Sequence, residues 1–348
     1  MMKYVPSVLA VSCVGVLLAG CGGSGGSDSG SSGTDVSLSF SDAPVQDAQE
    51  VVITVDTITF NRSGEDDIVV DTFTSDELGI EDADTFTLDL LDYQGADSVL
   101  VLDSVKLPVG EYSNLRLGIL DENLAFSYVV VGGNAYEIKV PSDELKLGGF
   151  TVSETTTQNF VVEFDLTRAL AHNPTPERYI LKPHGVRVVD LQEAATLQGT
   201  VDFDALHAIT PCDTKPVQTV DNIAYLYQGH DLDTNLLGDV FVRGPEPGEL
   251  VNGEPSVPDV DYDSDVPADI IAPYGSSIID NSEVSYIFSY VEPGDYTLAI
   301  SCEATDDNPI LWDEIPVPSP VLQVVELTLA EGETESCDFP LADGVCAP

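Results

Sequence analysis

The feature that most constrains this chain is an alternation of apolar side chains with a period of two residues. Phe160, Val162, Phe164 and Leu166 are spaced in this way, and the segment 115–119 repeats the pattern. Successive side chains of a β-strand point to opposite faces, so this spacing predicts strands with one buried face. Many such short runs, separated by Gly, Pro, Asp and Asn, predict an all-β chain built from β-sandwich domains.

Two local departures from this pattern lead to more specific expectations. The apolar positions are odd-numbered from Val51 to Val55 and even-numbered from Ile58 to Phe60. This change of phase predicts a β-bulge near Asp56-Thr57. Long amphipathic helices are absent from the pattern. We expect at most one or two helical turns within 166–172, and another within 75–83.

The N-terminus has the pattern of an export signal. Lys3 precedes a predominantly apolar run over residues 5–18, which is about the length of a signal-peptide core and short for a membrane span. The run ends in Leu18-Ala19-Gly20-Cys21, which resembles the lipobox of bacterial lipoproteins. We therefore expect residues 1–20 to be removed and Cys21 to carry lipid, which anchors the chain to a membrane. The alternatives are a plain signal peptide with an incidental cysteine and a permanent transmembrane anchor.

The next segment supports this interpretation. Residues 22–33 are almost entirely Gly and Ser, which predicts a flexible tether over 21–34. Gly22 is not the Asp that retains some lipoproteins at an inner membrane, so the outer membrane of the cell envelope is favoured. Whether the body faces the periplasm or the exterior stays open.

Charge excludes one class of partner. Without Lys3 the chain has 11 basic and 61 acidic residues, a net charge of −50. Binding to nucleic acid through phosphates requires Lys and Arg, so we expect no nucleic-acid partner. The acidity itself is explained either by a solvated surface suited to salty surroundings or by a surface that collects divalent cations.

Sequence composition predicts a domain boundary within 190–195. We expect a first domain over 35–192 and a second over 196–348. After residue 196 only Lys215 and Arg243 are basic, against 30 acidic residues. Residues 244–269, rich in Pro, Glu and Asp, are expected to form a long exposed excursion in the second domain.

Four cysteines remain after the signal and Cys21 are set aside, and all follow residue 200: Cys212, Cys302, Cys337 and Cys346. An even number in an exported protein predicts two disulfides, with three possible pairings. The pairing Cys212–Cys302 with Cys337–Cys346 is preferred. The second bond would close a short loop, and the first would join two strands of one domain.

One turn occurs in both halves. Residues 107–112 (Leu-Pro-Val-Gly-Glu-Tyr) lead into one apolar strand, and residues 291–296 (Val-Glu-Pro-Gly-Asp-Tyr) lead into another. Pro and Gly make a tight turn, and the Tyr packs at the start of the next strand. Such turns are common in transthyretin-like and immunoglobulin-like sandwiches, so we interpret them as architecture and not as a site.

A set of motifs in the first half resembles the bacterial domain of unknown function family 4382. The motifs are Ser41-Asp42-Ala43-Pro44, Leu88-Asp89-Leu90-Leu91, the turn ending at Tyr112 with Leu115-Arg116-Leu117, Ile138-Lys139-Val140-Pro141-Ser142, Val162-Glu163-Phe164-Asp165-Leu166, and Leu181-Lys182-Pro183 with Val186-Arg187-Val188-Val189. They fall in order across residues 35–190. The resemblance implies an exported, often lipid-anchored β domain and no known activity. The second half looks like a sandwich module that follows in such lipoproteins, from which the acidic excursion departs.

Catalytic motifs are absent from the sequence. None of the four histidines lies in HExxH, and no GxSxG occurs outside the tether. No cysteine is left over for thiol chemistry. We therefore expect no enzyme activity, and no cofactor except calcium.

The candidate calcium ligands are Asp259, Asp261, Asp263 and Asp265. Alternate carboxylates in a loop can direct several oxygens to one Ca²⁺, although Ser264 stands where an EF-hand has Gly. The alternative is a solvated acidic loop.

Two of the scarce basic residues are expected to have structural roles. Arg116 and Arg187 are flanked by apolar strand residues, so each is expected to form an ion pair on a sheet, with Asp165 or Asp89 as partners.

Three functions remain compatible with this sequence. The favoured one is a non-catalytic binding or adhesion module that meets an envelope or extracellular ligand. A structural component of the envelope and a polysaccharide hydrolase are the alternatives. A sugar-binding platform of Tyr225, Tyr227, Tyr286, Phe288 and Tyr290 would distinguish them, although such residues more often form core.

Overall fold

The fold is taken from a computed structural model, which describes residues 33–43, 48–141, 144–183, 185–215, 222–243, 250–251, 254–255, 263, 265–279, 284–305, 307–308, 311–342 and 346. Contacts group Gly33–Pro348 into one unit, separate from Met1–Ser32. The predicted signal peptide, Cys21 and nearly all of the tether lie outside the described residues. No helix among the described residues is long and apolar enough to cross a membrane.

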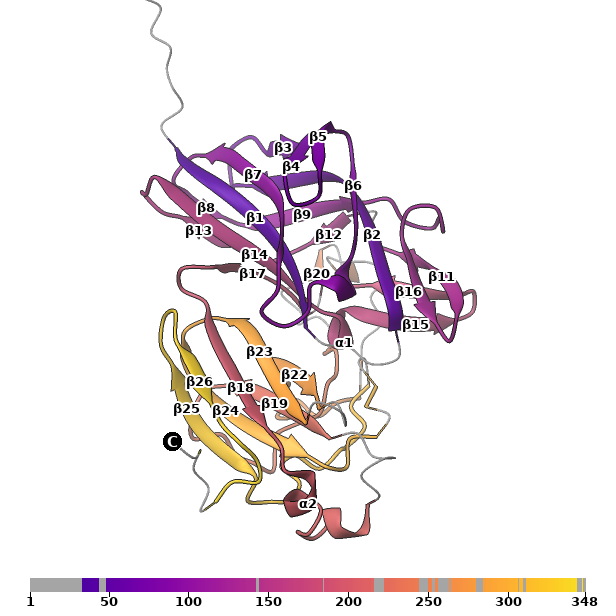
Figure 1. Cartoon of the computed structure of the whole chain (residues 1–348), viewed down its shortest axis with the longest axis vertical. Coiled ribbons are helices and arrows are strands. Elements are labelled where there is room, and N and C mark those ends of the chain that lie inside the picture. Colours follow the sequence, from indigo (N-terminus) through magenta and orange to yellow (C-terminus); the bar gives the residue numbers. More distant parts are fainter. Residues whose placement is uncertain are drawn as a thin grey trace, which may run out of the picture. The chain divides into compact units, whose positions relative to one another are not determined.

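The first half contains a four-stranded sheet in the order β17-β14-β1-β7 (Figure 1). Its strands are β1 (Thr34–Ala43), β7 (Val99–Leu107), β14 (Thr157–Asp165) and β17 (Val186–Asp190). β1 pairs parallel with β14, and the other pairs are antiparallel. The period-two runs of the sequence form these strands.

A nine-stranded sheet is built around the long strand β2 (Ala48–Asn61). Its main path is β12-β9-β2-β10-β11-β16-β15, and β3 and β6 also pair with β2. The bounds are β3 (Ile68–Val70), β6 (Phe86–Asp89), β9 (Asn114–Ile119), β10 (Tyr128–Val131), β11 (Asn134–Lys139), β12 (Glu144–Lys146), β15 (Leu170–Pro174) and β16 (Glu177–Leu181). Two small hairpin-like pairs complete this half: β4 (Phe73–Ser75) with β5 (Ile80–Ala83), and β8 (Gly110–Tyr112) with β13 (Phe150–Val152).

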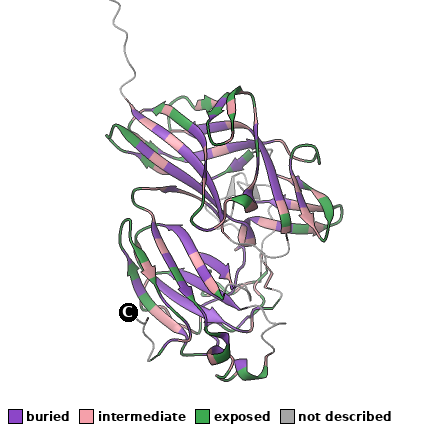
Figure 2. Ribbon diagram, viewed as in Figure 1, coloured by how far each residue is buried: buried purple, intermediate pink, exposed green. Residues whose placement is uncertain are grey.

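One hydrophobic core serves these sheets. It contains Phe40 of β1, Phe164 of β14, Ile53 of β2 and Leu117 of β9, each at most 1% exposed. Figure 2 shows the buried residues running through these strands. Burial of such side chains is worth roughly 1.5–3 kcal/mol each, which is the main stabilising contribution.

The predicted bulge is confirmed in β2. The pairing register between β2 and β9 shifts between Val55 and Thr57. Gly118 lies opposite, and a Cβ there would collide with the side chains of Asp56 and Thr57. The glycine therefore leaves room for the extra residue of the bulge.

The predicted helical turns are only partly present. A single turn, α1 (Leu166–Ala169), begins the segment 166–172, but the chain then returns to strand as β15. The expectation for 75–83 is wrong, because this segment contains the end of β4, a turn at 76–79 and the strand β5. Ser75 Oγ accepts the N–H of Leu78 at 3.1 Å, and Gly79 has φ +65°. Both features favour a turn over a continued helix. A further helical turn of this half is η1 (Leu90–Asp92).

The second half contains two facing sheets. A three-stranded sheet has the order β23-β18-β26, and a four-stranded sheet has the order β22-β19-β24-β25. The bounds are β18 (Ala195–Thr200), β19 (Ile223–Gln228), β22 (Gly275–Ile278), β23 (Ser285–Val291), β24 (Gly294–Ser301), β25 (Val324–Leu329) and β26 (Thr334–Ser336). β20 (Leu250–Val251) pairs with β21 (Glu254–Pro255), and short helical turns form α2 (Phe203–Leu206) and η3 (Cys212–Thr214).

Side chains from both sheets meet in one core cluster. Leu197 and Phe288 come from the three-stranded sheet, and Leu226 and Leu298 come from the four-stranded sheet. This arrangement is a β-sandwich. The prediction of an all-β chain with sandwich architecture is confirmed.

The opposite face of the four-stranded sheet is also buried. Tyr225, Tyr227 and Ala299 on this face pack against Leu237 and Ile315, which lie outside the strands. The segment 232–242 and the described part of the β24–β25 connection (302–305, 307–308 and 311–323) thus supply this third layer. It is the layer that holds the candidate site.

The repeated turn has the same hydrogen bond in both halves. Tyr112 Oη donates to the carbonyl of Pro108 at 2.9 Å, and Tyr296 Oη donates to the carbonyl of Glu292 at 2.8 Å. Each bond reaches four residues back along the chain, as in the tyrosine corner of immunoglobulin-like sandwiches. The motif fixes the turn between β7 and β8 in the first half and the turn between β23 and β24 in the second half.

Candidate functional site

A cavity of about 510 Å³ opens at the third layer of the second sandwich. Its lining comes from residues 234–237, Ile270 and the segment 312–321. We call it the Trp312 groove, after its single aromatic side chain. Leu237, Ile315 and Val317 are nearly buried at 5%, 9% and 6% exposure, whereas Val321 is 74% exposed. The groove therefore has an apolar floor and an apolar residue presented to solvent.

Asp239 anchors the segment that forms one part of the groove. Its Oδ2 accepts the backbone N–H of Asp313 at 3.0 Å and that of Ile315 at 2.9 Å. Asp239 is fully buried, and burial raises the pKa of its carboxyl to about 6, although the hydrogen bond from Ile315 opposes this shift. A buried carboxylate with two N–H donors holds the backbone in place on both sides of Glu314.

Glu314 is the one charged side chain among the described lining residues. Its φ is +57°, in the left-handed region that residues other than glycine adopt uncommonly. Such conformations persist where the surrounding structure enforces them, and they are frequent at binding sites. Here the two hydrogen bonds to Asp239 bracket Glu314.

Asp263 anchors Trp312 itself. Its Oδ2 accepts the N–H of Trp312 at 3.1 Å, and its Oδ1 accepts the N–H of Asp265 at 2.7 Å. These bonds, that from Asp265 first, lower the pKa of Asp263. Of the four predicted calcium ligands, Asp259 and Asp261 lie outside the described residues. The described residues contain no cluster of three or more metal-binding side chains. Calcium binding stays a prediction.

Asp307 joins the segment to the sheet beneath. Tyr225 Oη donates to its Oδ2 at 2.7 Å. Burial raises the pKa of Asp307 to about 7, and the carboxyl of Asp239 contributes in the same direction. Asp307 Oδ1 and Asp239 Oδ1 are buried without a hydrogen-bond partner. Near neutral pH the neighbouring carboxyls of Asp239 and Asp307 therefore tend to share a proton and not to be ionised together.

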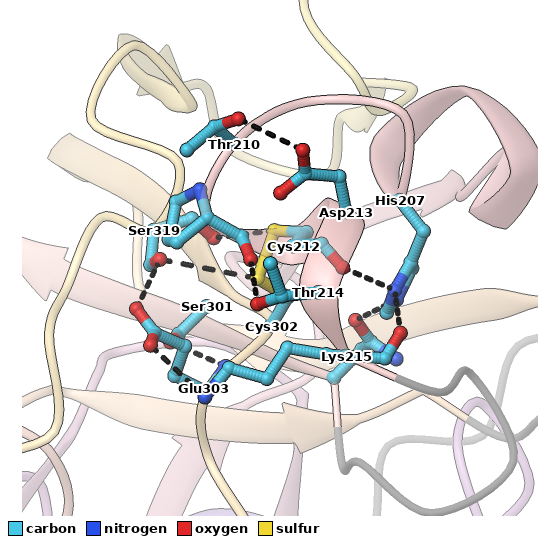
Figure 3. The surroundings of a disulfide bond; sticks show 12 residues. His207, Thr210, Cys212, Asp213, Thr214, Lys215, Ser301, Cys302, Glu303 and Ser319 are labelled. Carbon is cyan, nitrogen blue, oxygen red and sulfur yellow. Dashed lines mark hydrogen bonds and ion pairs between the residues drawn. A yellow bond between two sulfur atoms is a disulfide. The ribbon is translucent and has the colours of Figure 1, made fainter.

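The other end of the groove segment is anchored beside a disulfide (Figure 3). Cys212 is bonded to Cys302, and Cys337 is bonded to Cys346, which is the pairing preferred from the sequence. The carbonyl of Ser319 accepts the N–H of Cys302 at 3.1 Å. Ser319 Oγ donates to Glu303 Oε2 at 2.7 Å. Ser319 is therefore fixed, and the residues 316–318 before it are held as part of the groove.

The same close-up shows what surrounds this disulfide. Lys215 Nζ lies 3.2 Å from Glu303 Oε1, and His207 Nδ1 lies 3.2 Å from the carbonyl oxygen of Cys212 (Figure 3). The disulfide and its polar neighbours are thus engaged with one another. We assign them a structural role.

The aromatic platform considered from the sequence is core. Tyr225, Tyr227, Tyr286, Phe288 and Tyr290 are all buried, at 9% exposure or less. Sequence reasoning also missed Trp312, which no strand pattern marks. One signal was available: the sole tryptophan of the chain precedes Pro316, Pro318 and Pro320 in a stretch between two strands.

A second group of titratable residues is buried in the first half. Asp42 of β1 and Glu163 and Asp165 of β14 are at most 1% exposed, because the parallel pairing of β1 with β14 brings them together. Burial raises the pKa of Glu163 to about 8 and raises that of Asp42 well above its usual range. Arg168 Nη1 donates to the carbonyl of Tyr274 at 2.6 Å.

Perturbed pKa values often mark functional sites, but structural networks produce them as well. These carboxyls are buried, so we assign the group a structural role.

Arg187 interacts electrostatically with Asp165, one of the expected partners, whereas Arg116 pairs with a residue that was not expected. Arg187 Nη2 lies 4.0 Å from Glu163 Oε1, its neighbour across the β14–β17 pair. Arg116 Nη1 lies 3.6 Å from Glu144 Oε2, because β12 pairs with β9. Asp89 instead accepts the N–H groups of Val51 and Leu91.

Comparison with known families decides the identity of the first half. Residues 33–183 match the sequence profile of the domain of unknown function DUF4382. This segment is a DUF4382 domain. The resemblance inferred from the sequence motifs is confirmed, and the Trp312 groove lies outside the DUF4382 domain. No curated protein sequence matches the chain.

Several solved structures match this chain at low identity. The Bacillus anthracis TIE protein shares 8% identity at a TM-score of 0.18, over 88% of this chain and 34% of its own. GBS52, the minor pilin of Streptococcus agalactiae, shares 12% sequence identity at a TM-score of 0.17, and the match covers 87% of this chain and 94% of GBS52. BcpA, the major pilin subunit of Bacillus cereus, shares 8% sequence identity at a TM-score of 0.17, and the match covers 88% of this chain and 69% of BcpA. This chain spans about a third of the TIE protein. At such TM-scores these likenesses do not bear on function.

Proposed function

We propose that this chain is a lipid-anchored binding protein of the bacterial cell envelope that meets its partner through the Trp312 groove. In this account residues 1–20 are the export signal, Cys21 carries the lipid, and residues 21–34 are the tether. Two domains, 35–192 and 196–348, form the body. The partner is an envelope or extracellular ligand, and the chain acts without catalysis.

One observation carries the proposal: an apolar groove around the sole tryptophan is held rigid while its apolar edge is exposed. Val321 of the lining is 74% exposed, and its sequence neighbour Leu322 is 77% exposed. Leu311, the sequence neighbour of Trp312, is 47% exposed. The carboxylates of Asp263 and Asp239 accept hydrogen bonds from the backbone N–H groups of Trp312 and Ile315. These bonds hold the backbone of the groove segment in place. A preorganised apolar surface loses little conformational entropy when it binds, so it suits recognition.

Membrane anchoring is supported by the Leu-Ala-Gly-Cys motif and the Gly/Ser segment after it. Mass spectrometry of the native protein tests this part. We expect a chain that begins at an acylated Cys21, and the Cys21→Ser variant should be released from the membrane. An intact leader or an unmodified thiol on Cys21 would contradict the anchoring.

Binding is tested with the unit from Gly33 onward, against panels of glycans and of envelope proteins, with and without Ca²⁺. Because Trp312 is the only tryptophan, a ligand in the groove should change the intrinsic fluorescence of the protein. Val321→Ser should weaken binding about tenfold or more, and Val69→Ser, at a 55% exposed position of β3, should not. Ligands that bind without any effect of Val321→Ser would contradict the groove as the binding site.

A further inference from the structure

The chemistry of the Trp312 groove restricts what kind of partner it can receive. The inference below rests on the proposed function of the groove and concerns the class of its ligand. The groove combines an apolar lining with a charge of one sign.

Negative charge dominates the described surroundings of the groove. Glu314 lines it, and Asp233, Asp269 and Asp313, each a sequence neighbour of a lining residue, are exposed. These carboxylates are screened by only one nearby cation in the described part of the chain, Arg243. An anionic ligand would therefore be repelled, and a cationic ligand would be attracted.

Arg243 keeps its positive charge, but its guanidinium donors are used within the fold and the carboxylates around the groove outnumber it. Its Nη2 donates to the carbonyl of Ile270 at 2.7 Å, and its Nη1 donates to that of Pro267 at 3.2 Å. Its Cζ lies 5.4 Å from the centre of the Phe241 ring. The other basic residue after residue 196, Lys215, is paired with Glu303 beside the disulfide.

The side-chain hydrogen-bond donors of the described lining are the Thr234 hydroxyl, the Trp312 indole N–H and the Asn235 amide. Pro316 and Pro318 have no N–H group, and the side-chain amide of Asn235 already donates to Asp233 Oδ1 at 2.8 Å. A ligand that supplies donors matches such a surface better than one that needs them. Lys and Arg side chains are donors only, whereas sugar hydroxyls require both donors and acceptors.

The apolar part of the lining calls for aliphatic or aromatic side chains on the same ligand. Trp312 can contact an apolar side chain or the face of an Arg or Lys group. Val317, Pro318 and Val321 supply further apolar surface. A polypeptide can present both kinds of side chain within a few residues.

We propose that the Trp312 groove binds a basic polypeptide segment in which Lys or Arg residues alternate with apolar side chains. The apolar side chains contact Trp312 and Val321, and the cationic groups lie against Glu314 and the neighbouring carboxylates. The partner is thus a cationic protein surface or tail.

The test uses the unit Gly33–Pro348 with its disulfides intact and three synthetic peptides of equal length. One peptide alternates Lys with Leu, the second replaces Lys by Ser, and the third replaces Lys by Glu. Binding is followed by calorimetry and by the fluorescence of Trp312. We expect the Lys peptide to bind at least tenfold more tightly than the Ser peptide, and the Glu peptide not to bind. Affinity for the Lys peptide should fall several-fold as salt rises.

Variants separate the groove from non-specific attraction to an acidic protein. Val321→Ser should lower affinity for the Lys peptide about tenfold, and Glu314→Gln should lower it several-fold. Glu331→Gln removes one exposed charge elsewhere and should change it little. Equal effects of Glu314→Gln and Glu331→Gln would overturn the proposal, because they would show attraction without a site. Oligosaccharide binding that Val321→Ser abolishes, with no peptide bound, would overturn the ligand class and leave the groove as a binding site.

Discussion

Asp239 holds the backbone of Ile315 through a hydrogen bond of 2.9 Å from the Ile315 N–H to its Oδ2. The same oxygen accepts the N–H of Asp313, so a single buried carboxylate fixes the backbone on either side of Glu314. The geometry of the groove therefore depends on a residue that does not line it.

The Asp239→Ala variant should lose both this anchor and stability. The buried N–H of Ile315 would have no partner, and hydrogen bonds to a charged acceptor contribute about 1.5–3 kcal/mol each. We expect the free energy of unfolding to fall by about 2–3 kcal/mol in a urea titration and the Trp312 emission to shift to longer wavelength. The matched control Asp269→Ala, at an exposed position, should change neither quantity. An unchanged emission maximum in Asp239→Ala would contradict the role of the anchor.

The pH dependence of stability should have an unusual sign. The pKa values of Asp239 and Asp307 rise from the ordinary 3.8 to about 6 and about 7 in the fold. The folded chain thus binds protons more tightly than the unfolded chain, and the free energy of unfolding should fall as the pH rises from about 4 to about 7. Repulsion among the many carboxylates acts in the same direction.

The Asp307→Asn variant tests this assignment, because an amide is neutral at every pH and can still accept from Tyr225. At pH 7 to 8 it should be more stable than the natural protein by about 2–4 kcal/mol, and near pH 4 the difference should be small. Denaturant titrations at each pH give both values. If the free energy of unfolding of the natural protein rises from pH 5 to pH 7, groups other than Asp239 and Asp307 determine the pH dependence of its stability.

Glu163 and Arg187 lie close enough to form an ion pair, but burial favours the protonated acid. The pKa of Glu163 is raised to about 8 by burial, although Arg187 lowers it, and their closest atoms are 4.0 Å apart. Glu163→Gln should therefore stabilise the chain at pH 7, by about 1–3 kcal/mol. An ionised buried pair predicts the opposite, a loss of about 3–5 kcal/mol on removal of one charge. Thermal or denaturant unfolding at pH 7 distinguishes the two signs.

The two tyrosine turns should contribute equally and independently. Tyr112→Phe and Tyr296→Phe each remove one hydrogen bond to a carbonyl four residues back, worth about 1 kcal/mol. The rings belong to separate core clusters, so the double variant should lose the sum of the two single losses. A double variant no less stable than either single variant would contradict this independence.

Local patterns in the sequence predict most of the strands of the fold. The alternating runs predicted β14 and β9, and the change of phase in β2 predicted its bulge. The turn at 76–79 was missed because its determinants are a serine side chain that accepts a backbone N–H and a glycine with positive φ. Neither has a periodic signature.

The groove could not be derived in the same way, because its parts are distant in sequence. Asp239 and Ile315 are 76 residues apart, and Trp312 is joined to Asp263 over 49 residues. The acidic run predicts Asp263 as a calcium ligand, which stays a prediction. The run does not predict that the Asp263 carboxylate accepts two backbone N–H groups, as the structure shows. Which carboxylate meets which backbone segment is set by the sandwich, and not by local spacing.

The central claim is that the edge of the Trp312 groove is where this protein meets a basic partner. The direct measurement places a photo-crosslinking amino acid at Val321 of the full-length chain in its native cells, with Val69 as the control position. Mass spectrometry then identifies the crosslinked peptides. The account predicts crosslinks from Val321, and not from Val69, to segments rich in Lys or Arg with apolar neighbours. Identical crosslinks from both positions, or crosslinks from Val321 only to acidic or neutral segments, would contradict it.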